Sequence, residues 1–133
     1  MAVARRRIDP AEGLAALNQW AAGAVPPSGA APSVPAVPAV PRSVIATAVR
    51  YSLEEVTARA PGNSVEVRVP PFGVTQCVEG PRHTRGTPPN VIECDAATWL
   101  AMVTGRLSWA DAVGAGRVAA SGLRADLSAL LPL

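Results

Sequence analysis

The segment between residues 24 and 41 constrains the fold of this 133-residue chain more than any other part, because it contains six of the fourteen prolines. Proline fixes the backbone φ angle and removes an N–H donor, so this density excludes a helix or a central strand. The sequence therefore predicts three parts: a basic tail and short helix over residues 1–23, a Pro/Ala-rich linker over 24–41, and a folded domain over 42–133.

The short helix is predicted from its start signal and its spacing. The stretch DPAE at 9–12 places an N-cap residue, a first-turn proline and a glutamate in the order that favours a helix start. Leu14, Leu17 and Ala21 follow at helical spacing, with Trp20 alongside. A helix of this length is marginal in water by itself. We expect it to dock on the folded domain or on a partner, or to fray.

The hydrophobic period changes along residues 42–133 and predicts an α+β fold. Residues 65–69 read VEVRV, the alternation of a half-buried strand, and the short turn after them predicts an antiparallel hairpin. Asp95 and Ser108 are N-cap residues that begin two further helices. The predicted order is helix 42–60, strands 65–69, 74–79 and 90–94, the helices after 95 and 108, strand 117–121, and a last helix over 123–131.

The charge distribution excludes several classes of partner. The net charge of +2 is spread evenly along the chain, whereas nucleic-acid binders concentrate basic residues on one face. The run Arg5–Arg7 is interpreted as a solvated tail. No stretch approaches the roughly 18 apolar residues of a membrane span. Nor does an apolar signal region follow the first residues, so we expect a cytoplasmic location, no nucleic-acid partner and no membrane span.

The reactive side chains do not form a catalytic or metal-binding pattern. Cys77, His83 and Cys94 are the only Cys and His residues, and their spacing is wrong for a zinc site. Cys77 follows the alternation of a strand, which indicates packing, and nothing identifiable orients His83 as a base. We expect both cysteines to be small buried residues on strands. The sequence thus predicts no metal, no cofactor and no enzymatic activity.

A loop after the hairpin carries the most distinctive polar cluster. Arg82, His83 and Arg85 lie within four residues, flanked by glycine and proline. Arginine forms bidentate hydrogen bonds to carboxylate or phosphate, so these three residues are candidates for binding the anionic head of a ligand, or an acidic protein partner through residues 79–89. The alternative is that the arginines pair with Glu79 and Glu93 and only order the loop.

One stretch of the chain resembles a known family. Residues 95–112 read D-x-x-x-W-L-x-x-x-T-G-R-L-S-W-x-D-A, and residues 116–122 continue as G-R-V-x-x-S-G. Together with the hairpin at 64–70 and R-H-T-R-G at 82–86, this order resembles sterol-carrier-protein-2-like domains, in a bacterial branch of the actinobacterial type. The resemblance covers roughly residues 42–133.

The resemblance implies a mainly antiparallel sheet of four to five strands, covered by helices on one face, with an apolar cavity for a lipid, sterol or acyl chain. It implies a non-catalytic carrier domain. The alternative is a protein-interaction or enzyme-accessory domain without lipid cargo, related to the C-terminal domain of mycothiol-dependent isomerases. If no ligand enters, the apolar residues are a packed core. The candidate lipid-binding residues are Phe72, Trp99, Met102, Val103, Trp109, Leu127 and Leu130.

Overall fold

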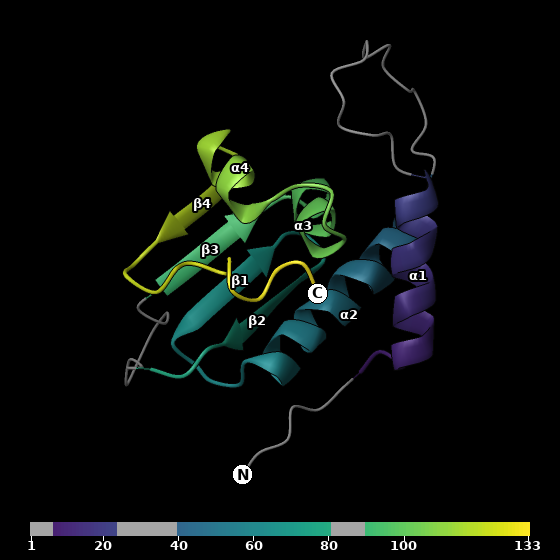
Figure 1. Ribbon diagram of the computed structural model, residues 1–133. Coiled ribbons are helices and arrows are strands. Elements are labelled where there is room, and N and C mark those ends of the chain that lie inside the picture. The colour runs from purple at the N-terminus through teal and green to yellow at the C-terminus, as the bar shows by residue number, and fades with distance from the viewer. Residues whose placement is uncertain (1–6, 24–39, 81–89) are drawn as a thin grey trace.

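The computed structural model describes residues 7–23, 40–80 and 90–133. In these residues the chain forms four helices and one four-stranded sheet, which confirms the α+β class (Figure 1). The helices are α1 (Pro10–Gly23), α2 (Arg42–Arg59), α3 (Ala96–Val103) and α4 (Trp109–Gly114), and the strands are β1 (Val65–Val69), β2 (Gly73–Cys77), β3 (Asn90–Cys94) and β4 (Val118–Ser121).

The sheet has the strand order β2-β1-β3-β4 and is mixed. β1 pairs with β2 antiparallel, as predicted, and β3 pairs with β4 antiparallel. β1 and β3 are parallel, with Val67 opposite Ile92, so the expectation of a mainly antiparallel sheet needs correction at this pair. The hairpin returns the chain to the end where β1 begins. A strand that starts at this end and pairs with the other edge of β1 must run parallel to it.

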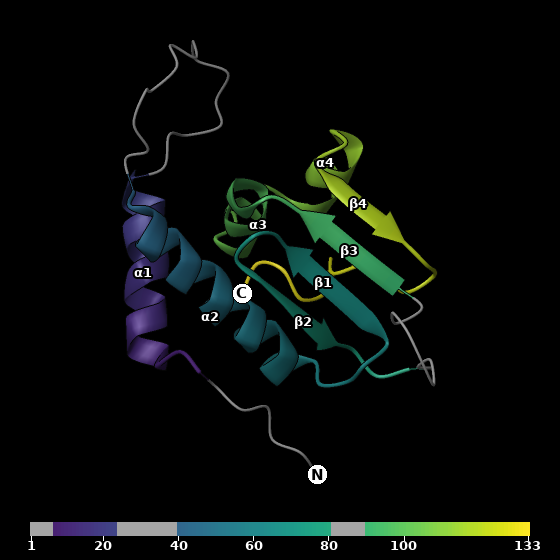
Figure 2. The same ribbon diagram turned by 180° about the vertical axis from the view of Figure 1, so that it is seen from behind.

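The two faces of the sheet differ in composition because β1 alternates. Val65, Val67 and Val69 are fully buried, whereas Glu66 and Arg68 point to the opposite face and form an ion pair. α2 and the C-terminal segment lie across the valine face in Figure 1. The turned view in Figure 2 shows the opposite face without a covering helix. This arrangement agrees with the prediction of helices on one face.

The core lies between β1, β3 and the helices α2 and α3. Its largest side chain is Trp99, which is fully buried on α3. The Trp99 Nε1–H donates to the Ser52 Oγ on α2 at 2.8 Å, and this hydroxyl donates to the Ala48 carbonyl at 2.8 Å. Among the described residues, every buried side-chain polar atom has a hydrogen-bond partner, which avoids the cost of burying an unpaired donor.

Local side-chain bonds begin the two short helices where the sequence predicted. The Asp95 carboxylate accepts from the Thr98 backbone N–H at 2.7 Å before α3, and the Ser108 hydroxyl accepts from the Asp111 N–H at 3.1 Å before α4. Earlier in the chain, Gly62 has a φ of 150° and leaves room for the Val78 backbone, which would lie 2.2 Å from a Cβ at this position. α2 ends just before this contact.

The predicted last helix over residues 123–131 is wrong. The segment after β4 forms turns instead, with Leu127 fully buried and Leu123 fully exposed. The Asp126 carboxylate accepts from the Ser128 backbone N–H at 2.8 Å, a local bond that competes with helical hydrogen bonding. The segment is held to β3 by the Arg124 N–H, which donates to the Asn90 side chain at 2.8 Å.

α1 packs along α2, as Figures 1 and 2 both show. Its buried face is Gly13, Ala16, Leu17 and Trp20, so the expected stripe through Leu14 is wrong, and Leu14 is exposed. Gly13 lies against the Tyr51 ring, where a Cβ would be 2.2 Å from Cγ. The predicted short helix therefore docks on the folded domain, and its register is set by this close contact.

Both ends of α1 are tied to the domain by polar groups. Before its first turn, the Glu54 carboxylate accepts from the backbone N–H groups of Arg7 and Ile8 at 2.8 and 3.1 Å. Near its last turn, the Arg106 guanidinium donates to the Ala21 carbonyl and lies 6.0 Å from the centre of the Trp20 ring. These groups supplement the apolar contacts between α1 and α2.

Candidate functional site

The structure divides the predicted lipid-binding residues into two groups. Trp99, Met102, Val103 and Leu127 are at most 1 % exposed and are part of the packed core. Phe72, Trp109 and Leu130 are only partly buried and lie at its margin. Ligand contact by all seven residues stays a prediction, and the partly exposed ones are those a ligand could reach without repacking the core.

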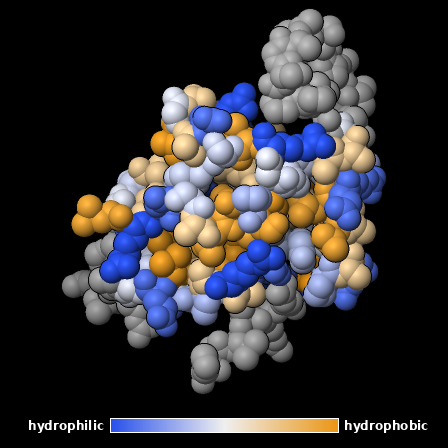
Figure 3. Space-filling view, viewed as in Figure 1, coloured by the Kyte–Doolittle hydropathy of each residue, from blue (hydrophilic) through white to orange (hydrophobic). Residues whose placement is uncertain are grey.

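Met102 and Trp109 line one groove, which we call the C-terminal groove. It has a volume of about 310 Å³ and lies between α3, α4 and the C-terminal segment. Figure 3 shows apolar residues gathered on the same face, around the C-terminal segment. The described residues that line it are Met102, Gly105, Leu107, Ser108, Trp109, Ala110, Ser128, Leu131 and Pro132.

The backbone around the C-terminal groove is set by a glycine and by one long-range hydrogen bond. Gly105 ends α3 with a φ of 79°, in the left-handed region that favours glycine, and a Cβ there would lie 3.6 Å from the Pro132 ring. The Leu133 N–H donates to the Val103 carbonyl at 3.1 Å. This bond fixes the C-terminal segment against α3, so one wall of the groove is held in place.

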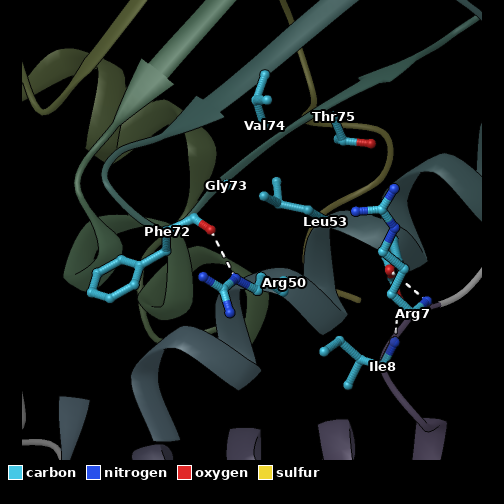
Figure 4. Close-up of a pocket in the computed structure, with 9 residues that line it drawn as sticks. Arg7, Ile8, Arg50, Leu53, Phe72, Gly73, Val74 and Thr75 are labelled. Atoms are coloured by element: carbon cyan, nitrogen blue, oxygen red, sulfur yellow. Dashed lines mark hydrogen bonds between the residues drawn. The ribbon is translucent and has the colours of Figure 1, made fainter. Parts of the chain in front are cut away.

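A second hollow, which we call the arginine pocket, lies between α2, the start of β2 and the residues before α1. Its volume is about 400 Å³. Figure 4 shows the Arg50 side chain on one side and the Arg7 side chain on the other, with Leu53 between them. Its described lining residues are Arg7, Ile8, Arg50, Leu53, Glu54, Phe72, Gly73, Val74 and Thr75.

Phe72 belongs to the surroundings of the arginine pocket and not to the C-terminal groove. Its carbonyl accepts from the Arg50 Nε–H at 3.0 Å, and the Arg42 guanidinium lies 5.1 Å from its ring centre. The seven predicted lipid-binding residues are therefore not brought together in one site. Sequence reasoning missed Arg7 and Arg50, because nothing in the pattern of the two segments indicates that they meet.

The cysteines fit their predicted role as buried residues on strands. Cys77 lies on β2 and Cys94 on β3, with β1 between these strands. Burial raises the pKa of the Cys77 thiol to about 11. Burial, with smaller contributions from the carboxylates of Asp95 and Glu93, raises the pKa of Cys94 to about 12. Both thiols are thus neutral at physiological pH, which is unfavourable for a nucleophile or a metal ligand.

The remaining predicted polar residues, Arg82, His83 and Arg85, lie outside the described residues. Their role in anion binding, and that of the loop 79–89 in partner binding, stays a prediction. Within residues 7–23, 40–80 and 90–133, no three His, Cys, Asp or Glu side chains gather as a metal site would require. Among the helices of this described part, none has the length and apolar character to span a membrane.

The four-stranded mixed sheet with helices on one face makes this a small α+β domain. Residues 41–133 match the family described as bacterial SCP ortholog, and because they make up more than half of the chain, it belongs to that family. The resemblance drawn from residues 95–122 is therefore confirmed. No curated protein matches the chain.

The family match begins at Pro41. The residues of α1, and Arg7 and Ile8 in the arginine pocket, thus lie outside the matched part. The C-terminal groove lies entirely within it.

Proposed function

We propose that this domain binds an apolar ligand, such as an acyl chain, in the C-terminal groove, and that it does so without catalysing a reaction. The observation that carries the proposal is the groove itself, which joins Met102 and Trp109 to Leu131 on the surface of a sterol-carrier-type fold. A volume near 310 Å³ falls at the lower end of small-molecule sites, which are roughly 300–1,000 Å³. The groove would therefore hold a short chain or one segment of a longer chain.

The same geometry supports the non-catalytic part of the proposal. None of the described residues that line the groove is acidic or basic, so they offer hydrophobic contact and little acid–base chemistry. Its two hydroxyl side chains are on Ser108, which caps α4, and on Ser128, beside Asp126. The two thiols of the sheet are neutral because burial raises the pKa of each.

A second function, protein interaction without lipid cargo, is favoured by a different observation. Trp99, Met102, Val103 and Leu127 are at most 1 % exposed, so a ligand could not enter between them without displacing core side chains. A domain of this kind would present its surface to a protein partner. The two functions make opposite predictions for an isolated apolar probe.

The test uses a fatty alcohol that carries a nitroxide quencher on its chain, because a neutral head group limits binding to apolar contact. We expect saturable quenching of Trp109 fluorescence, which the variant Trp109→Phe largely removes. Ser128→Phe fills the groove and should weaken binding about tenfold, since overpacking costs ~1–3 kcal/mol. Ala129→Phe is the matched control, because the exposed Ala129 follows Ser128 but does not line the groove.

The result that contradicts the proposal is clear. If the wild-type protein shows no saturable quenching, the groove is not an apolar-ligand site. The same conclusion follows if Ser128→Phe and Ala129→Phe bind the probe equally. The protein-interaction function would then be preferred.

A further inference from the structure

The arginine pocket combines apolar walls with positive charge. Ile8, Leu53 and Val74 supply aliphatic surface from three separate segments of the chain. Among the described residues, the charged ones of the lining are Arg7, Arg50 and Glu54, which sum to one positive charge. A hollow with this composition attracts a ligand that has one negative charge and a compact apolar body.

The hydrogen bonds in the pocket show which donors are available to such a ligand. Arg50 uses its Nε–H for the Phe72 carbonyl, which fixes the direction of the guanidinium (Figure 4). Its two terminal nitrogens have no partner among the described residues, and neither has the guanidinium of Arg7. The terminal nitrogens of arginine are the pair that binds a carboxylate in a bidentate manner.

Glu54 does not cancel this charge in a way that blocks an anion. Both of its carboxylate oxygens accept backbone N–H groups, from Arg7 at 2.8 Å and from Ile8 at 3.1 Å. Glu54 therefore holds the residues before α1 against α2, while the Arg7 side chain extends on from that anchored backbone. The acid positions one arginine of the pocket and leaves both guanidinium groups without a carboxylate partner among the described residues.

We propose that the arginine pocket binds a small organic monocarboxylate with a compact apolar body, the carboxylate lying against Arg50 and Arg7 and the body against Ile8, Leu53 and Val74. A volume near 400 Å³ suits a ring or a branched chain better than a long acyl chain. The site is independent of the C-terminal groove, since the two share no lining residue. It also depends on Arg7 and Ile8, which lie outside the family match.

The test is a titration of the full-length, ¹⁵N-labelled protein with phenylacetate, followed by amide chemical shifts. Phenylacetamide, which has the same shape without the charge, is the matched probe. We expect saturable shifts of the Leu53, Gly73 and Thr75 amides with phenylacetate, and about tenfold weaker binding of phenylacetamide because the charge-assisted hydrogen bonds are lost. Added salt should weaken the binding of phenylacetate and leave that of phenylacetamide unchanged.

Three variants locate the charge. Arg7→Gln keeps the backbone bonds to Glu54 and should weaken phenylacetate binding several-fold with the fold intact. Arg50→Gln should weaken it more, and Arg50→Lys should restore only part of the affinity because lysine lacks the planar fork. Arg117→Gln, on an exposed arginine remote in sequence from every lining segment, is the control and should bind as the wild type does.

The proposal is overturned by any of four results. One is the absence of saturable shifts with phenylacetate, and another is equal affinity for the acid and the amide. The third is that Arg7→Gln binds as Arg117→Gln does. Because Arg7→Gln removes no contact that the fold uses, this variant decides the matter even if Arg50→Gln fails to fold. Shifts confined to Met102 and Trp109 would assign the probe to the C-terminal groove and also overturn the proposal.

Discussion

The core between the sheet and α3 differs from the interface between α1 and α2 in how much of its side-chain surface is exposed to solvent. Trp99 and the three valines of β1 are fully buried, whereas Ala16, Leu17 and Trp20 on α1 keep 7–9 % of their surface exposed. The core is built from contacts between several strands and helices. In contrast, α1 contacts mainly α2, and its docking depends on a close approach at Gly13. We therefore predict that α1 can separate while the rest of the domain stays folded.

The largest expected effect is a loss of stability when the core around Trp99 is changed. Trp99→Ala removes the largest core side chain and leaves the Ser52 hydroxyl without its donor, so we expect a loss of ~3–5 kcal/mol in the free energy of unfolding. Chemical denaturation measures this. Trp99→Phe keeps most of the volume and should cost less. A loss below about 1 kcal/mol for the alanine variant would show that this region packs no more tightly than an ordinary surface, against the range for buried aromatics.

A smaller effect is expected at the α1 interface. An added Cβ at Gly13 would lie 2.2 Å from the Tyr51 ring, so Gly13→Ala should cost ~1–3 kcal/mol of docking free energy although alanine favours helix formation. Hydrogen exchange should become faster in α1 and remain unchanged in β1 and β3. Gly114→Ala in α4, where nothing lies within 4 Å, is the control and should be neutral or stabilising. Faster exchange throughout the sheet would contradict the comparison, because it would make α1 part of one cooperative unit with the core.

At neutral pH the smallest effect is expected at the buried thiols, because their effect appears only above pH 9. The pKa of Cys77 is raised to about 11 and that of Cys94 to about 12, so the folded state holds both protons at a pH where the unfolded chain, near pKa 9, begins to lose them. The free energy of unfolding should thus be unaffected by these groups below pH 9 and fall as the pH rises from 9 toward 11.

Thiol labelling at pH 8 provides the measurement for this region. We expect slow reaction of the native protein with a thiol reagent and an unchanged rate in Gly13→Ala, since release of α1 does not open the sheet. Fast labelling of the native wild-type protein would contradict the burial of both residues, and faster labelling in Gly13→Ala alone would show that α1 helps to close the core.

The sequence predicted the elements whose signals are local. Strand alternation located β1, N-cap residues located the starts of α3 and α4, and the short turn required an antiparallel hairpin. The last helix was predicted from the spacing of its leucines alone. That prediction failed because it did not take account of Asp126, whose carboxylate accepts a hydrogen bond from the local backbone. The parallel pairing of β1 with β3 could not be predicted, because the pattern of a strand does not specify which neighbour it will join.

The same distinction applies to the candidate sites. Met102 and Trp109 were predicted to lie near a ligand, and they do share a groove, because α3 and α4 are close in sequence. The arginine pocket depends on the meeting of residues 7–8, α2 and β2, which is set by the docking of α1. No local pattern carries that information. Because this chain contains arginine and no lysine, the choice of arginine at positions 7 and 50 is not a signal.

The central place of β1 has a consequence for the synthesis of this chain on the ribosome. β1 can pair with β2 as soon as the hairpin emerges, but its other edge must wait for β3, which follows roughly twenty residues later, or about one to four seconds at ordinary elongation rates. During that interval a nascent chain exposes an unpaired valine-rich edge. Glu66 and Arg68, alternating with the valines, place charge on one face of this strand and so discourage its pairing with a neighbouring nascent chain.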